Sequence, residues 1–214
     1  MTNRQKNALI GMILGDAYLQ KTGKRNARIR LEHGISQKDY LTWKMSILPQ
    51  YFQRKFEVIE RFNQIWNKKY TYVRAQSSSS PEFGRMQRLF YKNSEKIIPS
   101  TISSIFKNPL SLAIWFMDDG YYYHRDNIAY IYIPNYDEES IKNLLFCLET
   151  NFNLFPVLKK KKKGLVLIFS VKETRILVGI IRKFIVPPMF YKLPLDPVST
   201  ERNSHTGKSS EMVL

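Results

Sequence analysis

The sequence predicts an α+β protein made of two similar halves, each with the element order αββαββα and a four-stranded antiparallel sheet. Two observations lead to this fold class. The segments LIGMILGDA (residues 9–17) and LAIWFMDDG (residues 112–120) are variants of one pattern, an apolar run that ends in an acidic residue. When they are aligned, Asp119 falls 103 residues (119 − 16) after Asp16. The order of helical and strand-like patterns that follows the first segment is repeated after the second.

In the first half, the apolar run predicts a helix, and apolar and polar residues then alternate over residues 28–32, as in a strand. Residues 39–48 have helical spacing, and Pro49 ends that helix. The rest of this half is predicted as strands over residues 56–62 and 69–76 with a turn near Asn63, a loop over residues 77–80 that can cap a helix, and a helix over residues 83–91.

The second half repeats this order, and Pro109 is well placed to begin its motif helix. We expect strands over residues 121–123, 129–133, 155–160 and 165–170, and helices over residues 137–150 and 171–184. The predicted organisation is an N-terminal half (residues 1–100), a linker (101–108), a C-terminal half (109–197) and a flexible tail (198–214). Helices would cover one face of each sheet and leave the other face open to a partner.

The composition predicts a polyanionic partner. Lys and Arg number 34 against 18 Asp and Glu, a formal net charge of +16 with a pI near 9.8, and such an excess favours nucleic acid. A membrane partner is not expected, because no apolar run approaches the ~18 residues that a spanning helix needs. Cys147 is the single cysteine, which excludes disulfides. Together with a composition rich in Ile, Lys, Asn, Tyr and Phe, this favours an intracellular protein, with a mitochondrion or chloroplast as the expected compartment.

Gly11 and Gly15 lie four residues apart, so they share one face of the first motif helix. Small residues at this spacing let a second helix approach closely. The alternative is a core helix with incidental glycines. The second copy of the pattern favours the crossing of two motif helices, although Ile114 and Asp118 stand where the first copy has its glycines.

The paired segments resemble the two copies of the LAGLIDADG motif in single-chain homing endonucleases, and the repeated element order resembles that fold over roughly residues 4–195. The resemblance implies two motif helices packed side by side between two saddle-shaped DNA-binding sheets. It also implies that Asp16 and Asp119 bind a divalent metal, Mg²⁺ with Mn²⁺ as a plausible substitute. Asp118 is a second carboxylate here, but the register set by Asp16 selects Asp119, since Asp118 falls on Gly15.

The resemblance also implies further catalytic residues. Lys96 and Lys192 each stand shortly before a proline near the end of a half, where the family has a lysine beside the scissile phosphate. Gln37 resembles the glutamine of the family that positions a water molecule. In the second half, Pro134 or Asn135 stands at that place, and only Asn135 could act by hydrogen bonding.

Strand alternation predicts which side chains face DNA, because one parity of each strand points away from the core. An ordinary solvated sheet face is the alternative for each residue taken singly. A run of lysines at a predicted hairpin turn would bind phosphates without reading sequence, whereas His33, His124 and His205 show no metal-ligand spacing. The predicted DNA-facing residues are Arg28, Arg30, Glu32, Tyr70, Tyr72, Arg74, Gln76, Tyr130, Tyr132, Lys159, Lys160 and Lys161.

These features predict a monomeric, intron-encoded homing endonuclease that hydrolyses both strands of a long, asymmetric double-stranded DNA target. The alternative is an intron maturase with the same fold that binds intron RNA and assists splicing. Two carboxylates that face a polyanion favour the nuclease, because a protein that only binds nucleic acid has no need of them.

Overall fold

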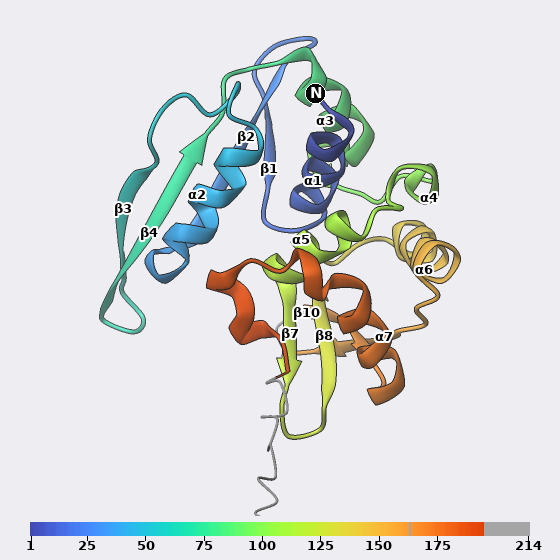
Figure 1. The fold of residues 1–214 in the computed structure, drawn as a ribbon. Helices are drawn as coiled ribbons and strands as arrows, with labels where there is room; N and C mark the ends of the chain where they lie inside the picture. Colours follow the sequence, from blue (N-terminus) through green and yellow to red (C-terminus); the bar gives the residue numbers. More distant parts are fainter. Residues whose placement is uncertain (163, 195–214) are drawn as a thin grey trace, which may run out of the picture.

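The computed structural model describes residues 1–162 and 164–194. The N-terminal half begins with helix α1, and the elements that follow it form one sheet with its covering helices (Figure 1). Its elements are α1 (Asn3–Leu14), β1 (Tyr18–Lys21), β2 (Ala27–Gly34), the 3₁₀ turn η1 (Ile35–Gln37), α2 (Lys38–Ile47), β3 (Glu57–Asn63), β4 (Lys68–Gln76) and α3 (Pro81–Phe90).

The C-terminal half repeats the order αββαββα, which confirms the predicted fold class. Its elements are α5 (Pro109–Asp119), β7 (Gly120–Tyr123), β8 (Ile128–Ile133), α6 (Glu138–Phe152), β9 (Val157–Lys161), β10 (Gly164–Phe169) and α7 (Val171–Ile181), followed by the 3₁₀ turns η2 (Arg182–Phe184) and η3 (Pro187–Lys192). The halves are joined through a short hairpin of β5 (Tyr91–Lys92) and β6 (Glu95–Lys96), and through α4 (Ile102–Ile105).

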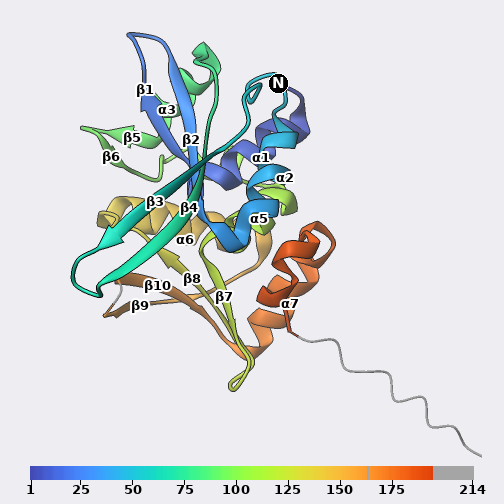
Figure 2. The same ribbon diagram turned by 90° about the vertical axis from the view of Figure 1, so that its left-hand side faces the viewer.

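The two four-stranded sheets are antiparallel and have equivalent strand orders, β1-β2-β4-β3 and β7-β8-β10-β9 (Figure 2). In the first sheet Tyr18 pairs with Arg30, and in the second Tyr121 pairs with Tyr130. Because Tyr18 pairs with Arg30 and Tyr121 with Tyr130, and because α2 begins at Lys38 and α6 at Glu138, equivalent positions in the segments β2–α2 and β8–α6 differ by 100 in number. This register decides which residues of the two halves correspond.

Helices α1 and α5 lie side by side in the centre of the molecule (Figure 1). A Cβ atom built on Gly11 would lie 2.4 Å from the carbonyl oxygen of Ser111, so glycine is required for this close approach. The Ser111 hydroxyl also donates to the carbonyl of Asn7 across the crossing, at 2.7 Å. Residues 8–14 of α1 and 110–117 of α5 are buried on all sides, as is typical of helices in the middle of a core.

Local signals explain where several helices begin. Asn108 caps α5, its side-chain oxygen accepting from the Leu110 N–H at 2.9 Å, and Pro109 occupies the first turn. Ser80 caps α3 in the same way. The predicted order αββαββα includes a strand at the place of β1, although no residues were assigned to it. Helix α4 was not predicted, and the last predicted helix gives way to a 3₁₀ turn after Ile181. Within the described residues, no helix has the length and apolar character to cross a bilayer.

Candidate active site and nucleic-acid interface

Asp16 and Asp119 lie at the C-terminal ends of α1 and α5, where the helix dipoles already present negative charge. Partial burial, with the Asp16 side chain still 37% exposed, and the nearby charge of Asp118 raise the pKa of Asp16 to about 6. Burial and the charges of Asp16 and Asp118 raise the pKa of Asp119 to about 8. Within the described residues, neither carboxylate forms an ion pair with a lysine or an arginine. Two poorly compensated carboxylates at helix ends that are linked by the hydrogen bond from the Asp16 N–H to Asp118 suit a hard divalent cation such as Mg²⁺.

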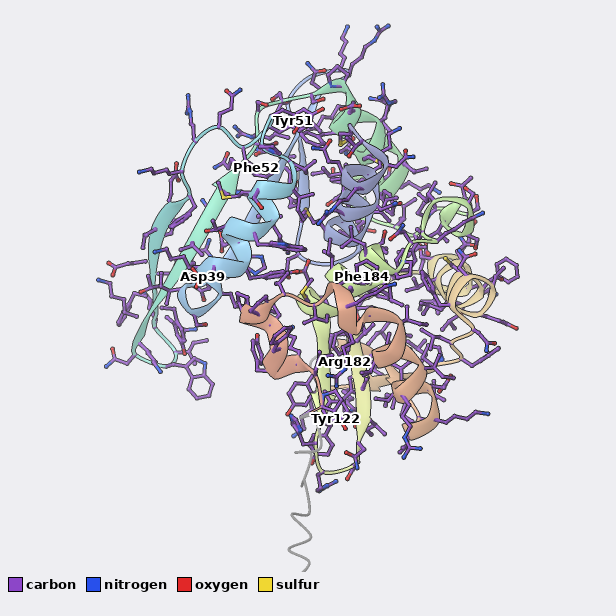
Figure 3. The ribbon with its side chains drawn as sticks, viewed as in Figure 1. Asp39, Tyr51, Phe52, Tyr122, Arg182 and Phe184 are labelled. Atoms are coloured by element: carbon purple, nitrogen blue, oxygen red, sulfur yellow. The ribbon has the colours of Figure 1, made fainter. Side chains whose placement is uncertain are left out.

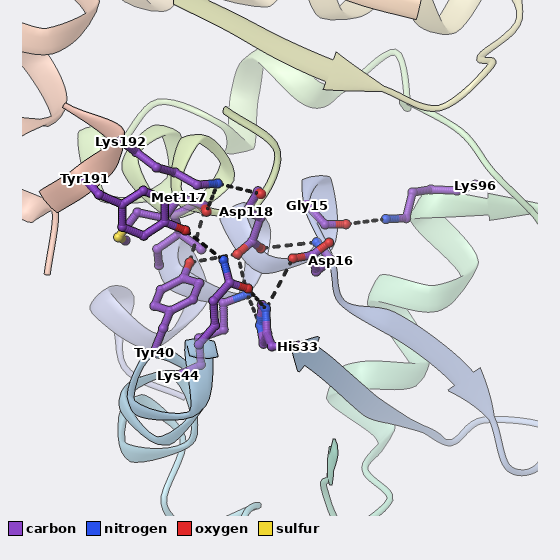
Figure 4. Close-up of polar contacts among 12 residues, drawn as sticks. Gly15, Asp16, His33, Tyr40, Lys44, Lys96, Met117, Asp118, Tyr191 and Lys192 are labelled. Carbon is purple, nitrogen blue, oxygen red and sulfur yellow. Dashed lines mark hydrogen bonds and ion pairs between the residues drawn. The ribbon is translucent and has the colours of Figure 1, made fainter. Parts of the chain in front are cut away.

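Lys96 and Lys192 occupy matching places at the two helix ends (Figure 4). The Lys96 ammonium donates to the Gly15 carbonyl at 2.9 Å, at the end of α1. The Lys192 ammonium donates to the carbonyls of Met117 at 2.6 Å and Asp118 at 2.9 Å, at the end of α5. Burial lowers the pKa of both lysines, although the aspartates oppose this shift. Each lysine thus offsets the negative end of one motif helix.

Asp118 is a structural carboxylate, because protein donors surround it. Its Oδ1 accepts from the Tyr40 hydroxyl at 2.8 Å and from the Lys44 ammonium at 2.5 Å. Its Oδ2 accepts from the Asp16 N–H at 3.1 Å. The side chains of Lys44 and Asp118 are both fully buried. This ion pair therefore joins α2 of the N-terminal half to α5 of the C-terminal half.

His33 brings a second type of metal-ligating group, an imidazole, to the centre. Ligand atoms of Asp16, His33 and Asp118 lie within 4.8 Å of one another, but the donors around Asp118 occupy its oxygens. The His33 ring lies 3.6 Å from Asp16 through its Nδ1. Burial, together with the Lys44 charge, lowers the pKa of His33 to about 4, so the ring is neutral at physiological pH. The spacing of the histidines in the sequence provided no signal for this position.

Gln37 joins the two halves. Its Oε1 lies 3.1 Å from His33 Nδ1, and its Nε2 donates to the Tyr191 hydroxyl at 3.0 Å. Asn135 is exposed and lies two residues before Asp137, the residue that the register matches to Gln37. Asp137 caps α6, its carboxylate accepting from the Ser140 N–H at 2.7 Å. The site is therefore asymmetric at this position.

Tyr136 of the C-terminal half lies near Asp119. Its hydroxyl is buried and, within the described residues, has no hydrogen-bond partner. Burial and the Asp119 charge raise the pKa of Tyr136.

Every side chain of the N-terminal half that strand alternation predicted to face DNA lies on the open face of its sheet. Pairs such as Arg30–Gln76 share this face, while Ile29 and Leu31 are buried below it. Glu32 lies between two arginines and accepts hydrogen bonds from Arg61 at 2.9 Å and Arg74 at 2.8 Å. Partial burial acts to raise the pKa of the Glu32 carboxyl, but these hydrogen bonds outweigh it and lower the pKa. The predicted residues on this face are Arg28, Arg30, Glu32, Tyr70, Tyr72, Arg74 and Gln76.

The open face of the C-terminal sheet is aromatic and basic. Tyr121 of β7 pairs with Tyr130, and the Lys161 ammonium lies 4.0 Å from the centroid of the Tyr130 ring. Lys159 and Tyr132 both pair with Val166, so they share this face. A surface pocket here is lined by Tyr121, Tyr123, Arg125, Asp126, Tyr130, Tyr132 and Lys161.

Lys160 departs from the other lysines of this run. It pairs with Leu165, which pairs with Ile133 of the core face, so it points away from the tyrosines.

Figure 3 labels residues from both halves of the protein. Tyr51 and Phe52 follow α2 in the N-terminal half, whereas Tyr122 and Arg182 belong to the C-terminal half (Figure 3). His124 contacts Tyr122 with ring centroids 4.8 Å apart, at the tip of the β7–β8 hairpin. His205 and residues 195–214, which include the predicted tail, lie outside the described residues.

Comparison with known proteins supports the sequence-based resemblance. Residues 6–177 match the model of the LAGLIDADG DNA endonuclease family. A probable intron-encoded endonuclease 1 of Wickerhamomyces canadensis is 29% identical over 194 residues, which are 88% of this chain and 83% of that protein. The cytochrome b mRNA maturase bI2 of Debaryomyces hansenii is 26% identical over 190 residues, 86% of this chain and 71% of the maturase.

Among solved structures, the homing endonuclease I-WcaI bound to its DNA recognition sequence superposes with a TM-score of 0.83. The two proteins are 26% identical, and the match covers 92% of this chain and 88% of the other. The agreement extends over both halves of the fold.

Proposed function

This chain belongs to the LAGLIDADG DNA endonuclease family, and we propose on that basis that it cuts both strands of a long, asymmetric DNA target as a homing endonuclease. One observation carries the proposal. Asp16 and Asp119, one from each half, lie at the ends of the two packed helices with raised pKa values and no lysine or arginine ion partner among the described residues. Such a pair serves hydrolysis of a phosphodiester better than it serves binding, because carboxylates repel phosphate.

Asp16 and Asp119 would hold Mg²⁺, or Mn²⁺ in its place. When bound, the metal supplies a hydroxide nucleophile and stabilises charge on the attacking and leaving oxygens. The chain itself contributes orientation: the Asp118 carboxylate holds the backbone N–H of Asp16, which fixes the loop that carries the carboxylate.

Lys96 and Lys192 would stabilise the negative charge that develops on phosphorus as its bond to the nucleophile forms. Their ammonium groups already lie at the two helix ends beside the carboxylates. Gln37 would position the water molecule for one of the two phosphates. The proposal assigns no matching role to Asn135, since the register places it away from the Gln37 position.

The two open sheet faces would hold the DNA. On the N-terminal sheet, arginines, glutamine and tyrosines provide hydrogen-bond donors and apolar edges for base contacts in the major groove. On the C-terminal sheet, tyrosines provide that surface, and Lys159 and Lys161 lie beside them to bind phosphates. Because the side chains of the two sheets differ, the half-sites that they read would differ too.

A single chain supplies both halves, which supports action as a monomer. The family relative named as intron-encoded supports an origin within an intron, and we place the protein inside the cell, in an organelle.

An RNA-binding maturase is the second candidate, and the similarity to a cytochrome b mRNA maturase favours it. Retention of both carboxylates and both lysines favours the nuclease, since RNA binding alone requires none of the four.

The test is incubation with Mg²⁺ and a plasmid library that contains the intronless form of the gene surrounding the coding sequence. Double-strand cleavage at one site supports the proposal. Lack of cleavage combined with tight binding of the intron RNA would overturn it in favour of the maturase. The Asp119→Asn variant is the matched control, because it keeps size and shape but removes a metal ligand.

A further inference from the structure

A chain of four hydrogen-bonding side chains runs from the protein interior to the candidate active site. Figure 4 labels three of them, Lys44, His33 and Tyr191. It begins at Lys44, whose Nζ lies 3.2 Å from His33 Nε2. His33 Nδ1 lies 3.1 Å from Gln37 Oε1, and Gln37 Nε2 lies 3.0 Å from the Tyr191 hydroxyl. Of these four residues, the proposed mechanism uses only Gln37.

The hydrogen-bonding capacity of each group fixes which atom donates and which accepts along this chain of side chains. A lysine ammonium can only donate, so His33 Nε2 must accept, and the single proton of the neutral ring lies on Nδ1. That N–H donates to Gln37 Oε1, which turns the amide nitrogen of Gln37 toward Tyr191. The Tyr191 hydroxyl accepts from Gln37 and keeps its own proton for an acceptor on the solvent side, where its side chain is 60% exposed.

The start of the chain is held rigidly. Lys44 is fully buried and ion-paired with the equally buried Asp118, and its ammonium also lies 4.6 Å from the centroid of the Tyr40 ring. Tyr40 in turn donates to Asp118. A donor held on this many sides cannot turn away from His33, so the order of donors and acceptors is set before any substrate binds.

Among the described residues of the C-terminal half, no such chain is present. The 100-residue register places Ile133 at the position of His33, Leu144 at that of Lys44 and Asp137 at that of Gln37. Ile133 and Leu144 are buried apolar residues, and Asp137 is engaged in the cap of α6. In the part of the chain that the structure describes, this arrangement therefore lies on the side of the site that contains Asp16 and not on the other.

We propose that Lys44 and His33 are positioning residues that fix the amide of Gln37 and the hydroxyl of Tyr191 for attack on one DNA strand. The inference rests on the proposed function, because it requires that Gln37 faces a scissile phosphate. The chain presents two hydrogen-bond donors in fixed directions at that phosphate, whereas the other strand is cut without them. Pre-set donors cost no reorganisation when the reaction occurs.

The first test measures the proton on His33 directly and does not depend on cleavage. Long-range ¹H–¹⁵N NMR of the metal-free protein distinguishes the two neutral tautomers, and loss of one set of signals in His33→Leu assigns them to this ring. We expect the proton on Nδ1. A proton on Nε2, or an equal mixture of tautomers, would overturn the proposal.

The second test follows the two strands separately on a supercoiled plasmid with the target site. His33→Leu, which copies the apolar character of the opposite half, is expected to slow cleavage of one strand roughly 10- to 100-fold, so that nicked plasmid accumulates. The matched control is Ile133→Leu, which should leave both rates unchanged. Equal slowing of both strands, or no slowing, would refute the inference.

Failure of the wild-type protein to cut DNA would instead refute the proposed function. The NMR measurement would still decide the state of His33, so the two failures are distinguishable.

Discussion

The carboxylate of Asp118 occupies the space beside Gly15: a Cβ atom built on Gly15 would lie 2.4 Å from Asp118 Oδ2. The same oxygen accepts the hydrogen bond from the Asp16 N–H. The absence of a side chain at one position therefore makes room for a buried charge at another. The crossing of the two central helices and the placement of a candidate metal ligand depend on the same contact.

Gly15→Ala should disrupt this contact. The new methyl group would overlap the Asp118 side chain in a fully packed core, which typically costs about 1–3 kcal/mol of unfolding free energy. Gly179→Ala is the matched control, since a Cβ there would meet no heavy atom within 4 Å on an exposed helix face, and alanine favours helix by roughly 0.5–1 kcal/mol. Urea unfolding of both variants measures the difference. Equal stability of the two would contradict the close crossing.

Lys44→Met should be strongly destabilising, because it leaves the Asp118 carboxylate buried without its cation. Removal of one partner from a buried pair costs about 3–5 kcal/mol. In Lys44→Met/Asp118→Asn no charge remains unpaired, so much of that loss should be recovered. Chemical denaturation of the single and double variants gives the coupling energy. A loss below about 1 kcal/mol in the single variant would show that the pair is accessible to water.

Asp16→Asn and Asp119→Asn should each reduce cleavage by about 100-fold or more, since a bound metal contributes several kcal/mol to such reactions. DNA affinity in the absence of metal should stay the same or increase, because a negative charge that faces phosphate is removed. Single-turnover cleavage and fluorescence anisotropy measure the two effects. Loss of DNA binding would instead assign the residue to packing.

The stability of the metal-free protein should fall as pH rises. The pKa of Asp16 is raised to about 6 and that of Asp119 to about 8, so the folded state binds protons more tightly than the unfolded chain. Their contribution to stability is complete below pH ~4 and is lost as pH rises through 6 and then 8. Thermal melts between pH 5 and pH 9 should show this trend, with a smaller slope above pH 7 in Asp119→Asn. If the slope of stability against pH above pH 7 were the same in Asp119→Asn as in the wild type, this would contradict the raised pKa of Asp119.

Mg²⁺ should reverse this loss, because it binds the ionised carboxylates. The increase in melting temperature on adding Mg²⁺ should be larger at pH 8.5 than at pH 5.5. Raising the Mg²⁺ concentration should also extend cleavage to lower pH, since metal and proton compete for the same oxygens.

Lys161 and Lys160 are neighbours in sequence on opposite faces of the sheet, which allows a matched comparison. Lys161→Ala should reduce the slope of log K against log salt by about 0.9, the value for one phosphate contact. Lys160→Ala should leave the slope unchanged. Binding titrations at several salt concentrations measure both. Equal slopes in the two variants would show that the lysine run acts as a mobile loop.

Much of the fold could be predicted because its signals are local. Gly11 and Gly15 indicated a close helix crossing, Pro109 marked the start of α5, and alternation along β2 separated Ile29 and Leu31 from the arginines between them. Strand β1, at residues 18–21, is too short to show a clear alternation.

The candidate site could be predicted only in part, because its contacts are long-range. Lys44 lies in a helix with few charged neighbours and binds Asp118, 74 residues away. His33 falls on the core-facing parity of β2, and nothing in its neighbourhood in the sequence indicates that the buried ring contacts Lys44 and Gln37. Similarly, Lys160 could be separated from Lys161 only after the pairing of β9 with β10 was known.

The contact between Gly15 and Asp118 means that the two halves are not interchangeable. A dimer of two N-terminal halves would place glycine against glycine and leave two copies of Lys44 buried without an acid. A dimer of two C-terminal halves would bring two Asp118 carboxylates together, with Leu144 in place of the lysine. Either symmetric assembly would bury unpaired charge at its centre. The contacts at the helix crossing therefore favour association of unlike halves, so that a separately expressed half would bind the other half and not a copy of itself.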